Sequence, residues 1–305
     1  MRVYLTVDIG GTKTSTALFN QNGEMIDESF KVTPSKTYEG EESVYKNTLR
    51  AVQKTLNDFN YELIGVGVGA PGSMDTKAGV ILHAPMMGWH NYPIVKRLQD
   101  KFGVTVKLEN DSNLGVLAEQ RCGVAKGLKN IGYMTVSTGI GGGLYLNGDF
   151  YRGKNGGAAE FGHISINPDG EICPCGNYGC LELYASGTAL ERRLNRGFKN
   201  AKQLAIAASE GDIYALKMYD EVGYYLGLGI TTIWNMLDLD MLVLGGGLTH
   251  AREHFKKRLF STIKERTIQE FSQKQVAFSV LNDRAILYGA YYLISEEKKN
   301  GKNLK

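Results

Sequence analysis

The sequence predicts an α/β protein of two domains, and three observations support this. Its 305 residues correspond to two domains at roughly 150 residues each. Runs with the two-residue period of strands alternate with runs of helical period. A strand, a glycine turn and a second strand occur twice, at residues 3–19 and 131–147, with Thr beside several Gly in both turns. We interpret these segments as two copies of one architecture, each binding part of a ligand in a cleft between the domains.

The first half of the chain begins with a predicted hairpin. Its strands are VYLTV and TSTALF, joined by the DIGGT turn, and the tight turn NQNG leads to a third strand, EMIDESFKV. Residues 41–59 carry apolar side chains at helical spacing. Strands are expected at 64–69 and 104–108, and the second of them ends at ENDSN, where a helix begins.

The second half of the chain repeats this order of elements. IGYMTVS at 131–137 is a predicted strand, and GLYLNGDFY after it is a hairpin with an Asn-Gly turn. Helical patterns occupy most of 183–237. A buried strand, MLVLGGG at 241–247, precedes a basic helix from about residue 251, and residues 285–294 are predicted to form a closing helix.

These elements place a domain boundary near residues 109–112. The expected N-terminal domain is small, spans residues 1–110 and is joined by the C-terminal helix at about 285–296. The larger domain is expected to span residues 111–284. Residues 297–305, which end in KKNGKNLK, are predicted to be a flexible tail.

Composition excludes several classes of protein. Lys and Arg number 35 and Asp and Glu 32, a formal net charge of +3, which is too balanced for a nucleic-acid-binding protein with a concentrated basic face. No run of about 18 apolar residues is present, so a membrane span is not expected. The N-terminal apolar run is too short for a signal peptide. We therefore expect a cytoplasmic protein with no nucleic-acid or membrane partner.

The glycine-rich segments do not match two common phosphate-binding motifs. No Gly-Lys is followed by Ser or Thr, so a Walker A loop is absent. A GxGxxG string is formed by Gly67, Gly69 and Gly72, but Pro71 and a segment without helical period follow it. The helix N-terminus that would bind a pyrophosphate is therefore missing, and a dinucleotide site is not favoured.

The DIGGTKT turn is a better candidate for binding nucleotide phosphates. An Asp at a strand end followed by two Gly leaves backbone N–H groups free to face phosphate oxygens, and Asp8 can hold water around Mg²⁺. STGIGGG at 137–143 offers a second such turn, and LGGG at 244–247 suits an adenosine face. The alternative is that each turn is only a tight hairpin. The candidate nucleotide residues are Asp8, Gly10, Gly11, Thr12, Lys13, Thr138, Gly139, Gly246 and Gly247.

One His and three Cys have the spacing of a metal site. His163, Cys173, Cys175 and Cys180 form H-x9-C-x-C-x4-C, and Zn²⁺ prefers four tetrahedral N and S ligands in closed structural sites. The alternative is a group of cytosolic thiols that pack together or undergo redox chemistry. The remaining cysteine, Cys122, is expected to be a buried thiol.

Two carboxylates flank this predicted zinc site. Glu160 lies three residues before His163, and Glu182 lies two residues after Cys180. One ion would therefore fix the positions of both. Since His163 has two ring nitrogens, one could ligate zinc while the other forms a hydrogen bond with a substrate hydroxyl.

Asn110 and Asp111 follow the strand at 104–108, where ligands bind in α/β sheets. A phosphoryl acceptor hydroxyl needs a carboxylate to orient it and take its proton, and Asp111 is the candidate base. Asn110 would donate to and accept from a neighbouring hydroxyl. Without further context, Asn-Asp before a helix is more often a helix cap.

Taken together, these motifs resemble the ROK family of sugar kinases, in the hexokinase/actin-like ATPase superfamily. DIGGTKTSTAL, GAPG, ENDSNLGVLAE, STGIGGG, EFGHISI with CPCGNYGCLE, and LVLGGG occur in the family's order from residue 3 to about residue 292. The resemblance implies a two-domain actin-like (ribonuclease H-like) fold with a central cleft, structural zinc, Mg-ATP as phosphate donor, and a homodimer or homotetramer. It implies that the sugar is bound by Gly72, Asn110, Asp111, Glu160, His163 and Glu182.

The expected activity is transfer of phosphate from ATP to the primary hydroxyl of a hexose, with glucose as the first choice. Met86 and Met87 stand where glucokinase-like members often have Asn-Leu, so N-acetylmannosamine, N-acetylglucosamine, allose and fructose are alternatives. The family also contains sugar-responsive repressors. With the first phosphate strand at residue 3, we expect no preceding DNA-binding domain. A non-catalytic sugar sensor is the remaining alternative, and the presence of Asp8 and Asp111 is evidence against it.

Overall fold

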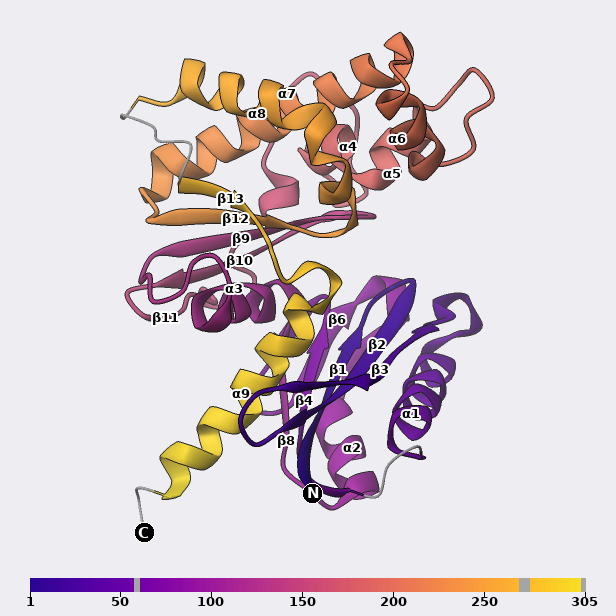
Figure 1. Cartoon of the computed structure of the whole chain (residues 1–305), viewed down its shortest axis with the longest axis vertical. Coiled ribbons are helices and arrows are strands. Elements are labelled where there is room, and N and C mark those ends of the chain that lie inside the picture. Colours follow the sequence, from indigo (N-terminus) through magenta and orange to yellow (C-terminus); the bar gives the residue numbers. More distant parts are fainter. Residues whose placement is uncertain (58–60, 269–274, 303–305) are drawn as a thin grey trace. The chain divides into compact units, whose positions relative to one another are not determined.

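The computed structural model describes residues 1–57, 61–268 and 275–302 (Figure 1). The chain folds into two compact units. The first unit consists of Met1–Cys122, Arg152–Gly157 and Arg284–Lys305, and the second of Gly123–Tyr151 and Ala158–Asp283.

The first unit contains a mixed five-stranded sheet in the order β3-β2-β1-β4-β8. Strands β1 and β2 form the predicted hairpin and are antiparallel, whereas β1, β4 and β8 run parallel. The carboxyl ends of these three parallel strands therefore lie at one edge of the sheet. The strands are β1 (Arg2–Ile9), β2 (Lys13–Asn20), β3 (Met25–Pro34), β4 (Glu62–Ala70) and β8 (Val106–Asn110).

Alternate residues of β4 are glycine because the C-terminal helix α9 (Ala285–Lys302) packs on that face of the strand. A Cβ on Gly67 would lie 2.2 Å from the backbone oxygen of Ala290, far inside van der Waals contact. Helix α3 (Asp111–Cys122) packs on α9 just as closely, since a Cβ on Gly289 would lie 2.0 Å from the Leu114 oxygen. Packing on α9 thus extends the first unit through α3 to Cys122, beyond the boundary that the sequence places near 109–112.

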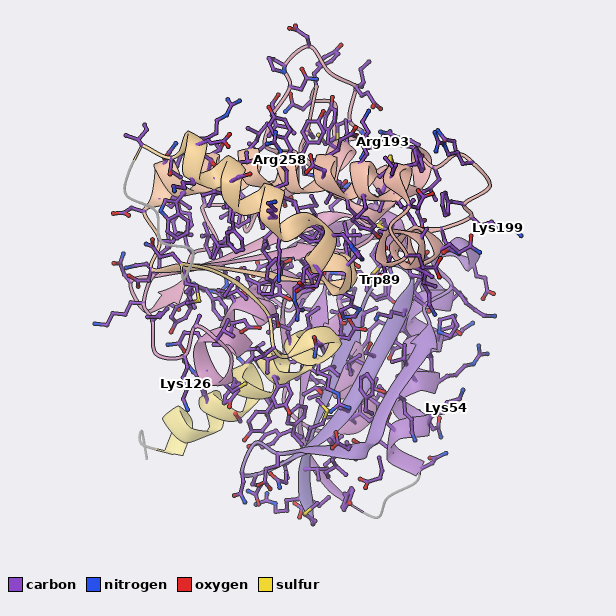
Figure 2. The ribbon with its side chains drawn as sticks, turned by 45° about the horizontal axis from the view of Figure 1, so that its top comes forward. Lys54, Trp89, Lys126, Arg193, Lys199 and Arg258 are labelled. Carbon is purple, nitrogen blue, oxygen red and sulfur yellow. The ribbon has the colours of Figure 1, made fainter. Side chains whose placement is uncertain are left out.

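The other side of the first unit's sheet is covered by α1 and α2 and bounded by a small antiparallel sheet, β5-β6-β7, which the sequence analysis did not predict. Trp89 of this small sheet is buried. Its ring stacks on Tyr92 with the centroids 4.6 Å apart, and its Nε1 donates to the Glu41 oxygen. Lys54 of α1, by contrast, is exposed and points outward (Figure 2). These elements are η1 (Thr37–Glu39), α1 (Glu41–Asn57), β5 (Ser73–Asp75), β6 (Val80–Ala84), η2 (Pro85–Met87), β7 (Trp89–Tyr92) and α2 (Ile94–Phe102). The short helix η6 (Asn282–Arg284) lies where the chain passes from the second unit back to the first.

The second unit repeats the first sheet. Its order is β11-β10-β9-β12-β13, with an antiparallel pair β9 and β10 and parallel neighbours β9, β12 and β13. Counted from the first strand of each unit, both orders are 3-2-1-4-5, which confirms the prediction of one architecture used twice. The strands are β9 (Ile131–Val136), β10 (Ile140–Leu146), β11 (Asp149–Phe150), β12 (Met241–Gly245) and β13 (Val276–Phe278).

Helices cover one face of this second sheet, and the two longest pack closely together (Figure 1). Gly223 in one of them permits this, because a Cβ there would lie 2.5 Å from the Phe255 oxygen of the other. Arg258 lies over the ring of Tyr224 at the same contact, 5.0 Å from its centroid (Figure 2). The helices are η3 (Phe161–His163), α4 (Glu182–Ala185), α5 (Gly187–Arg192), α6 (Ala201–Ser209), α7 (Ile213–Leu237), η4 (Gly247–Ala251) and α8 (Arg252–Arg266).

The closing helix is longer than the sequence predicts. Helix α9 continues to Lys302, through residues expected to begin a flexible tail at 297, and residues 303–305 lie outside the described part. Among the described residues, no helix combines the length and apolar character needed to cross a membrane.

Candidate functional site

The predicted sugar and base residues of the first unit meet at one edge of its sheet. Asp8 pairs with Gly69 across β1 and β4, and Ala70 pairs with Asn110 across β4 and β8. The turn that carries Gly72 therefore starts beside Asn110. Gly72 itself has a φ of 95°, and a Cβ there would lie 2.3 Å from the His83 oxygen, so this turn requires glycine.

Asn110 caps helix α3. Its Oδ1 accepts from the N–H groups of Ser112 (2.9 Å) and Asn113 (3.3 Å). These two donors occupy both lone pairs of that oxygen, which leaves the Nδ2 group to donate to a ligand. The helix cap considered from the sequence is therefore present. The sequence also predicts that Asn110 accepts a hydrogen bond from a substrate hydroxyl, but its Oδ1 already accepts from two backbone N–H groups.

Asp111 is the first residue of α3, and its carboxylate is oriented by its neighbour. The Ser112 N–H donates to Oδ1 at 2.7 Å and the Ser112 hydroxyl at 3.3 Å. The residue as a whole keeps some exposed surface. Burial of the carboxyl nevertheless raises the pKa of Asp111, against the lowering effect of the bonds from Ser112. A carboxylate with a raised pKa suits a general base.

Glu109, next to this pair, forms an ion pair that the sequence analysis missed. Its buried carboxylate accepts from Arg152 Nε at 2.9 Å and Nη2 at 2.6 Å, and from Asn113 Nδ2 at 2.9 Å. The Asn110 N–H also donates to it, at 3.0 Å. Glu109 thus fixes the backbone that leads into Asn110 and Asp111, and its charge is balanced by Arg152 from 43 residues further along the chain.

The first glycine turn is held by its carbonyl oxygens. Ser35 Oγ donates to the Gly10 oxygen at 2.6 Å, Thr37 Oγ1 donates to the Gly11 oxygen at 3.2 Å, and the Ser35 N–H donates to the Thr12 oxygen. The Gly10 N–H donates to the Lys13 oxygen at 2.9 Å, so the amides that follow Gly10 in the turn are the natural contacts for a phosphate. The turn is predicted from the sequence, whereas Ser35 and Thr37, which shape it, lie outside any motif and were missed.

The other two predicted nucleotide turns lie side by side in the second unit. Strands β9 and β12 are parallel neighbours, and the residues after them are in close contact: a Cβ on Gly246 would lie 2.6 Å from the Val136 oxygen. Gly246 has a φ of 89° and the Thr249 hydroxyl donates to its oxygen at 2.7 Å. Thr138, Gly139, Gly246 and Gly247 are therefore brought together at the carboxyl ends of two adjacent strands, where ligands bind in such sheets.

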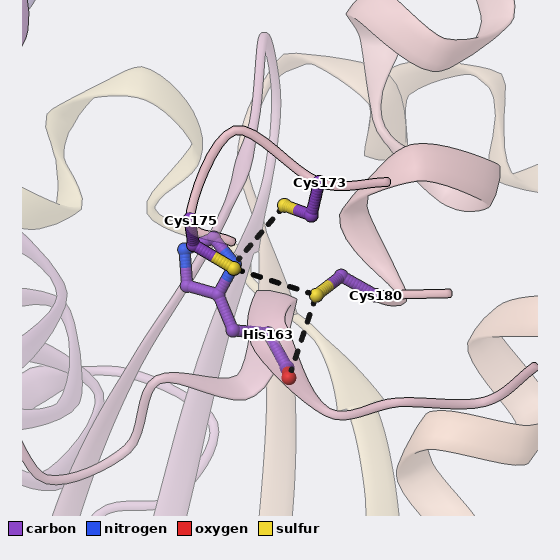
Figure 3. A group of neighbouring side chains, drawn as sticks. All are labelled: His163, Cys173, Cys175 and Cys180. Atoms are coloured by element: carbon purple, nitrogen blue, oxygen red, sulfur yellow. Dashed lines mark hydrogen bonds between the residues drawn. The ribbon is translucent and has the colours of Figure 1, made fainter. Parts of the chain in front are cut away.

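His163, Cys173, Cys175 and Cys180 converge in the second unit (Figure 3). Their candidate ligand atoms all lie within 4.8 Å of one another, Cys173 Sγ is 3.7 Å from His163 Nδ1, and Cys175 Sγ is 3.7 Å from Cys180 Sγ. The cysteines are not joined by disulfides.

This geometry fits a tetrahedral zinc ion. With Zn–S bonds of about 2.3 Å, two thiolates on a tetrahedron lie about 3.8 Å apart, and a sulfur and an imidazole nitrogen about 3.6 Å apart. The observed separations of 3.7 Å match both values. Because Nδ1 of His163 faces the sulfurs, its Nε2 is the nitrogen left for a substrate.

The pKa values of these thiols also argue against a redox site. Burial raises the pKa of Cys173, and it raises the pKa of Cys180 to about 12, so neither would be a thiolate at neutral pH without a nearby positive charge. Cys175 is exposed, and the Asn177 N–H lowers its pKa. Two buried thiols grouped with an imidazole are therefore better explained by a metal centre than by a redox site, whose cysteines need a lowered pKa.

The loop around the cluster depends on Gly179, which has a φ of 62°. A Cβ there would lie 1.6 Å from the Asn167 oxygen, whereas a Cβ on Gly176, with a φ of 92°, would meet nothing within 4 Å.

We expect Gly176→Ala to lower the free energy of unfolding by about 1–2 kcal/mol through backbone strain alone. Gly179→Ala should lower the free energy of unfolding by about 1–3 kcal/mol more than Gly176→Ala does, since the loop must also move. Urea unfolding of both variants measures this, and equal losses would contradict the steric argument.

The two flanking carboxylates differ in their surroundings. Glu160 is exposed and precedes η3. Glu182 is partly buried at the start of α4, and its Oε2 accepts from the Ile140 N–H at 2.7 Å. Glu182 therefore contacts the second glycine turn, a contact that the sequence analysis did not predict.

The chain is similar in sequence and in fold to known proteins. The ROK family matches residues 4–297. A glucokinase of Halalkalibacterium halodurans is 32% identical over 97% of this chain and 96% of its own. The crystal structure of a ROK family glucokinase from Streptomyces griseus in complex with glucose and AMPPNP superposes with a TM-score of 0.86, at 29% identity, over 96% of this chain and 99% of that one. A xylose repressor of Caldicellulosiruptor bescii is 28% identical over 94% of this chain and 77% of its own.

Proposed function

The chain belongs to the ROK family, and from this premise we propose that it transfers the γ-phosphoryl group of ATP to the primary hydroxyl of glucose, forming glucose 6-phosphate. The observation that carries the proposal is the similarity, over nearly the whole chain, to a glucokinase whose structure contains glucose and AMPPNP. The fold is the predicted α/β fold of the actin-like ATPases, with one strand order in both units.

In the proposed reaction Asp111 takes the proton of the attacking hydroxyl. Its Oδ1 is held by Ser112, so the carboxylate is oriented before substrate arrives, and its raised pKa makes it a stronger base than an ordinary aspartate. Phosphoryl transfer otherwise depends on positioning and charge stabilisation, and the Mg²⁺ that accompanies ATP neutralises charge on the phosphates. Asp8 would hold the water around that ion.

The phosphates and the nucleoside would bind to the three glycine turns. We assign the phosphates to the turn Gly10–Lys13, through the amides that follow Gly10, and to Thr138 and Gly139. We assign the adenosine to Gly246 and Gly247. Two observations support this assignment. The hydroxyls of Ser35 and Thr37 donate to carbonyl oxygens of the first turn, and the segment at Gly246 lies close to Val136.

The remaining sugar hydroxyls would bind to side chains beside the metal cluster. We propose that Glu160, Glu182 and His163 Nε2 contact them, while Asn110 donates from Nδ2 and Gly72 lines the pocket. The zinc ion, held by His163, Cys173, Cys175 and Cys180, would be structural, because four protein ligands leave no open position for chemistry. Sites built to hydrogen-bond hydroxyls discriminate strongly between sugars.

A sugar sensor without catalysis is the second candidate, because a xylose repressor is among the relatives. The oriented carboxylate of Asp111 argues for a kinase, since sugar binding alone does not require a base of raised pKa. A sensor would bind sugar but consume no ATP.

An ATP-coupled assay against a hexose panel tests the proposal. We expect turnover with glucose, and kcat/KM for glucose above that for N-acetylmannosamine, N-acetylglucosamine, allose and fructose. Higher kcat/KM for one of these sugars would overturn the assignment of glucose. Sugar binding by calorimetry with no turnover on any sugar would identify a sensor.

We also propose a cellular location and an oligomeric state for the enzyme. A glucose kinase acts on cytoplasmic ATP and glucose, and we propose a homodimer or homotetramer in the cytoplasm, which light scattering of the purified protein would test.

A further inference from the structure

The segment that follows the last cysteine of the metal cluster holds the second glycine turn. The Gly187 N–H donates to the Ser137 oxygen at 2.7 Å, and the Thr188 N–H donates to the Thr138 oxygen at 3.1 Å. These bonds fix both carbonyls ahead of Gly139. Residues 182–188 and the turn are thus one hydrogen-bonded assembly within the second unit.

Glu182 supplies the third bond of this assembly, and it is the only one of the three made by a side chain. Its Oε2 accepts from the Ile140 N–H at 2.7 Å, and a Cβ on Gly139 would lie 2.4 Å from that same oxygen. The carboxylate is therefore in contact with the backbone on the strand side of the turn, and a side chain at position 139 would displace Oε2 from its present place. Charge-assisted bonds of this kind are among the stronger ones in proteins.

We propose that Glu182 is a positioning residue for the nucleotide as well as a sugar ligand. Through Oε2 it holds Thr138 and Gly139 in the conformation that meets the phosphates, and Oε1 remains for a sugar hydroxyl. This inference rests on the proposed function, in which the turn binds nucleotide. One carboxylate would then serve both substrates, and loss of its Oε2 contact would weaken nucleotide binding even when no sugar is present.

The test is the Kd of Mg-AMPPNP measured by calorimetry without sugar. Glu182→Ala should weaken binding about ten-fold, since it removes a hydrogen bond to a charged acceptor. Glu182→Gln keeps an oxygen that can accept from the Ile140 N–H, so its Kd for the nucleotide should stay within about two-fold of the parent, while its KM for sugar rises. If Glu182 had a purely structural role, Glu182→Gln would not change the KM for sugar while leaving the Kd for the nucleotide as in the parent.

Glu171→Ala is the matched control. Glu171 is a carboxylate of the loop that carries the cysteines, but it pairs with Arg192 at 2.8 Å, and its loss should leave the Kd unchanged. An unchanged Kd for Glu182→Ala, or equal weakening in Glu171→Ala, would overturn the inference. If the parent protein itself binds no Mg-AMPPNP, the proposed function fails together with the inference.

A second variant approaches the contact from the turn and remains available if Glu182→Ala does not fold. Gly139→Ala places a methyl group 2.4 Å from Oε2 and so displaces that oxygen, and it should also weaken nucleotide binding. In the double variant Glu182→Ala with Gly139→Ala, we expect less than the sum of the single losses, because both act on one contact. Unchanged nucleotide binding in Gly139→Ala, or full additivity, would contradict the assignment.

Discussion

Replacing Asp111 by Asn is expected to lower kcat by about a thousand-fold, within the usual range for loss of a general base. The amide has nearly the shape of the carboxylate and can still accept from Ser112, but it cannot take a proton from the attacking hydroxyl. The Kd for Mg-AMPPNP should change little, since the base assists the acceptor rather than the nucleotide. A coupled assay with saturating glucose and ATP measures kcat.

The parent enzyme should lose activity on the acid side of its pH profile. Asp111 must be ionised to act as the base, so kcat/KM falls as pH falls through its pKa. Because burial raises that pKa, the acid limb should lie above pH of about 4, the value for an ordinary aspartate. Asp111→Asn should lack this limb.

Asp100→Asn is the control for this prediction. Asp100 pairs with Lys96 on the surface of α2, and its neutralisation should leave kcat and the pH profile as in the parent. Substantial residual turnover in Asp111→Asn, with an unchanged acid limb, would remove the base assignment.

Replacing Cys180 by Ser is expected to release zinc and destabilise the second unit. Cys180 is fully buried and packs with Leu183 and Tyr184, so its loss as a ligand leaves the other buried thiol of the cluster, Cys173, without a cation. We expect a loss of about 3 kcal/mol or more, the range for loss of a metal or of a buried network, and a fall in melting temperature of about 10 °C. Calorimetry and zinc analysis of the same preparations measure both effects.

Activity should fall with the metal, since Glu182 lies two residues from Cys180 and Glu160 three residues from His163. Cys122→Ser is the matched control, because Cys122 lies in the first unit, outside the cluster, and should keep its full zinc content. A Cys180→Ser protein with unchanged zinc and melting temperature would contradict the predicted ligand set.

Features encoded locally in the chain could be predicted from the sequence. The strands and glycine turns were recognised from two-residue periodicity, and the metal cluster was recognised because its four ligands lie within 18 residues, from His163 to Cys180. The repeated order of the two sheets was also expected, because the hairpin that opens each unit carries the same glycine and threonine pattern.

Contacts between distant segments could not be predicted in this way. Arg152 reaches Glu109 across 43 residues, and Glu182 reaches Ile140 across 42, and no pattern along the chain marks either pair. The first unit extends to Cys122 because α9 packs on α3, which depends on a helix at the other end of the chain. The sheet of β5, β6 and β7 has short strands whose alternation is too brief to recognise.

Elemental analysis of active protein, purified without added metal, tests most directly whether His163, Cys173, Cys175 and Cys180 form a structural zinc centre. The expected result is about one zinc ion per chain, as four protein ligands make one closed site, with loss of glucose phosphorylation when a chelator removes it. Full phosphorylation of glucose by protein free of transition metal would contradict that centre and the placement of Glu160 and Glu182 that depends on it.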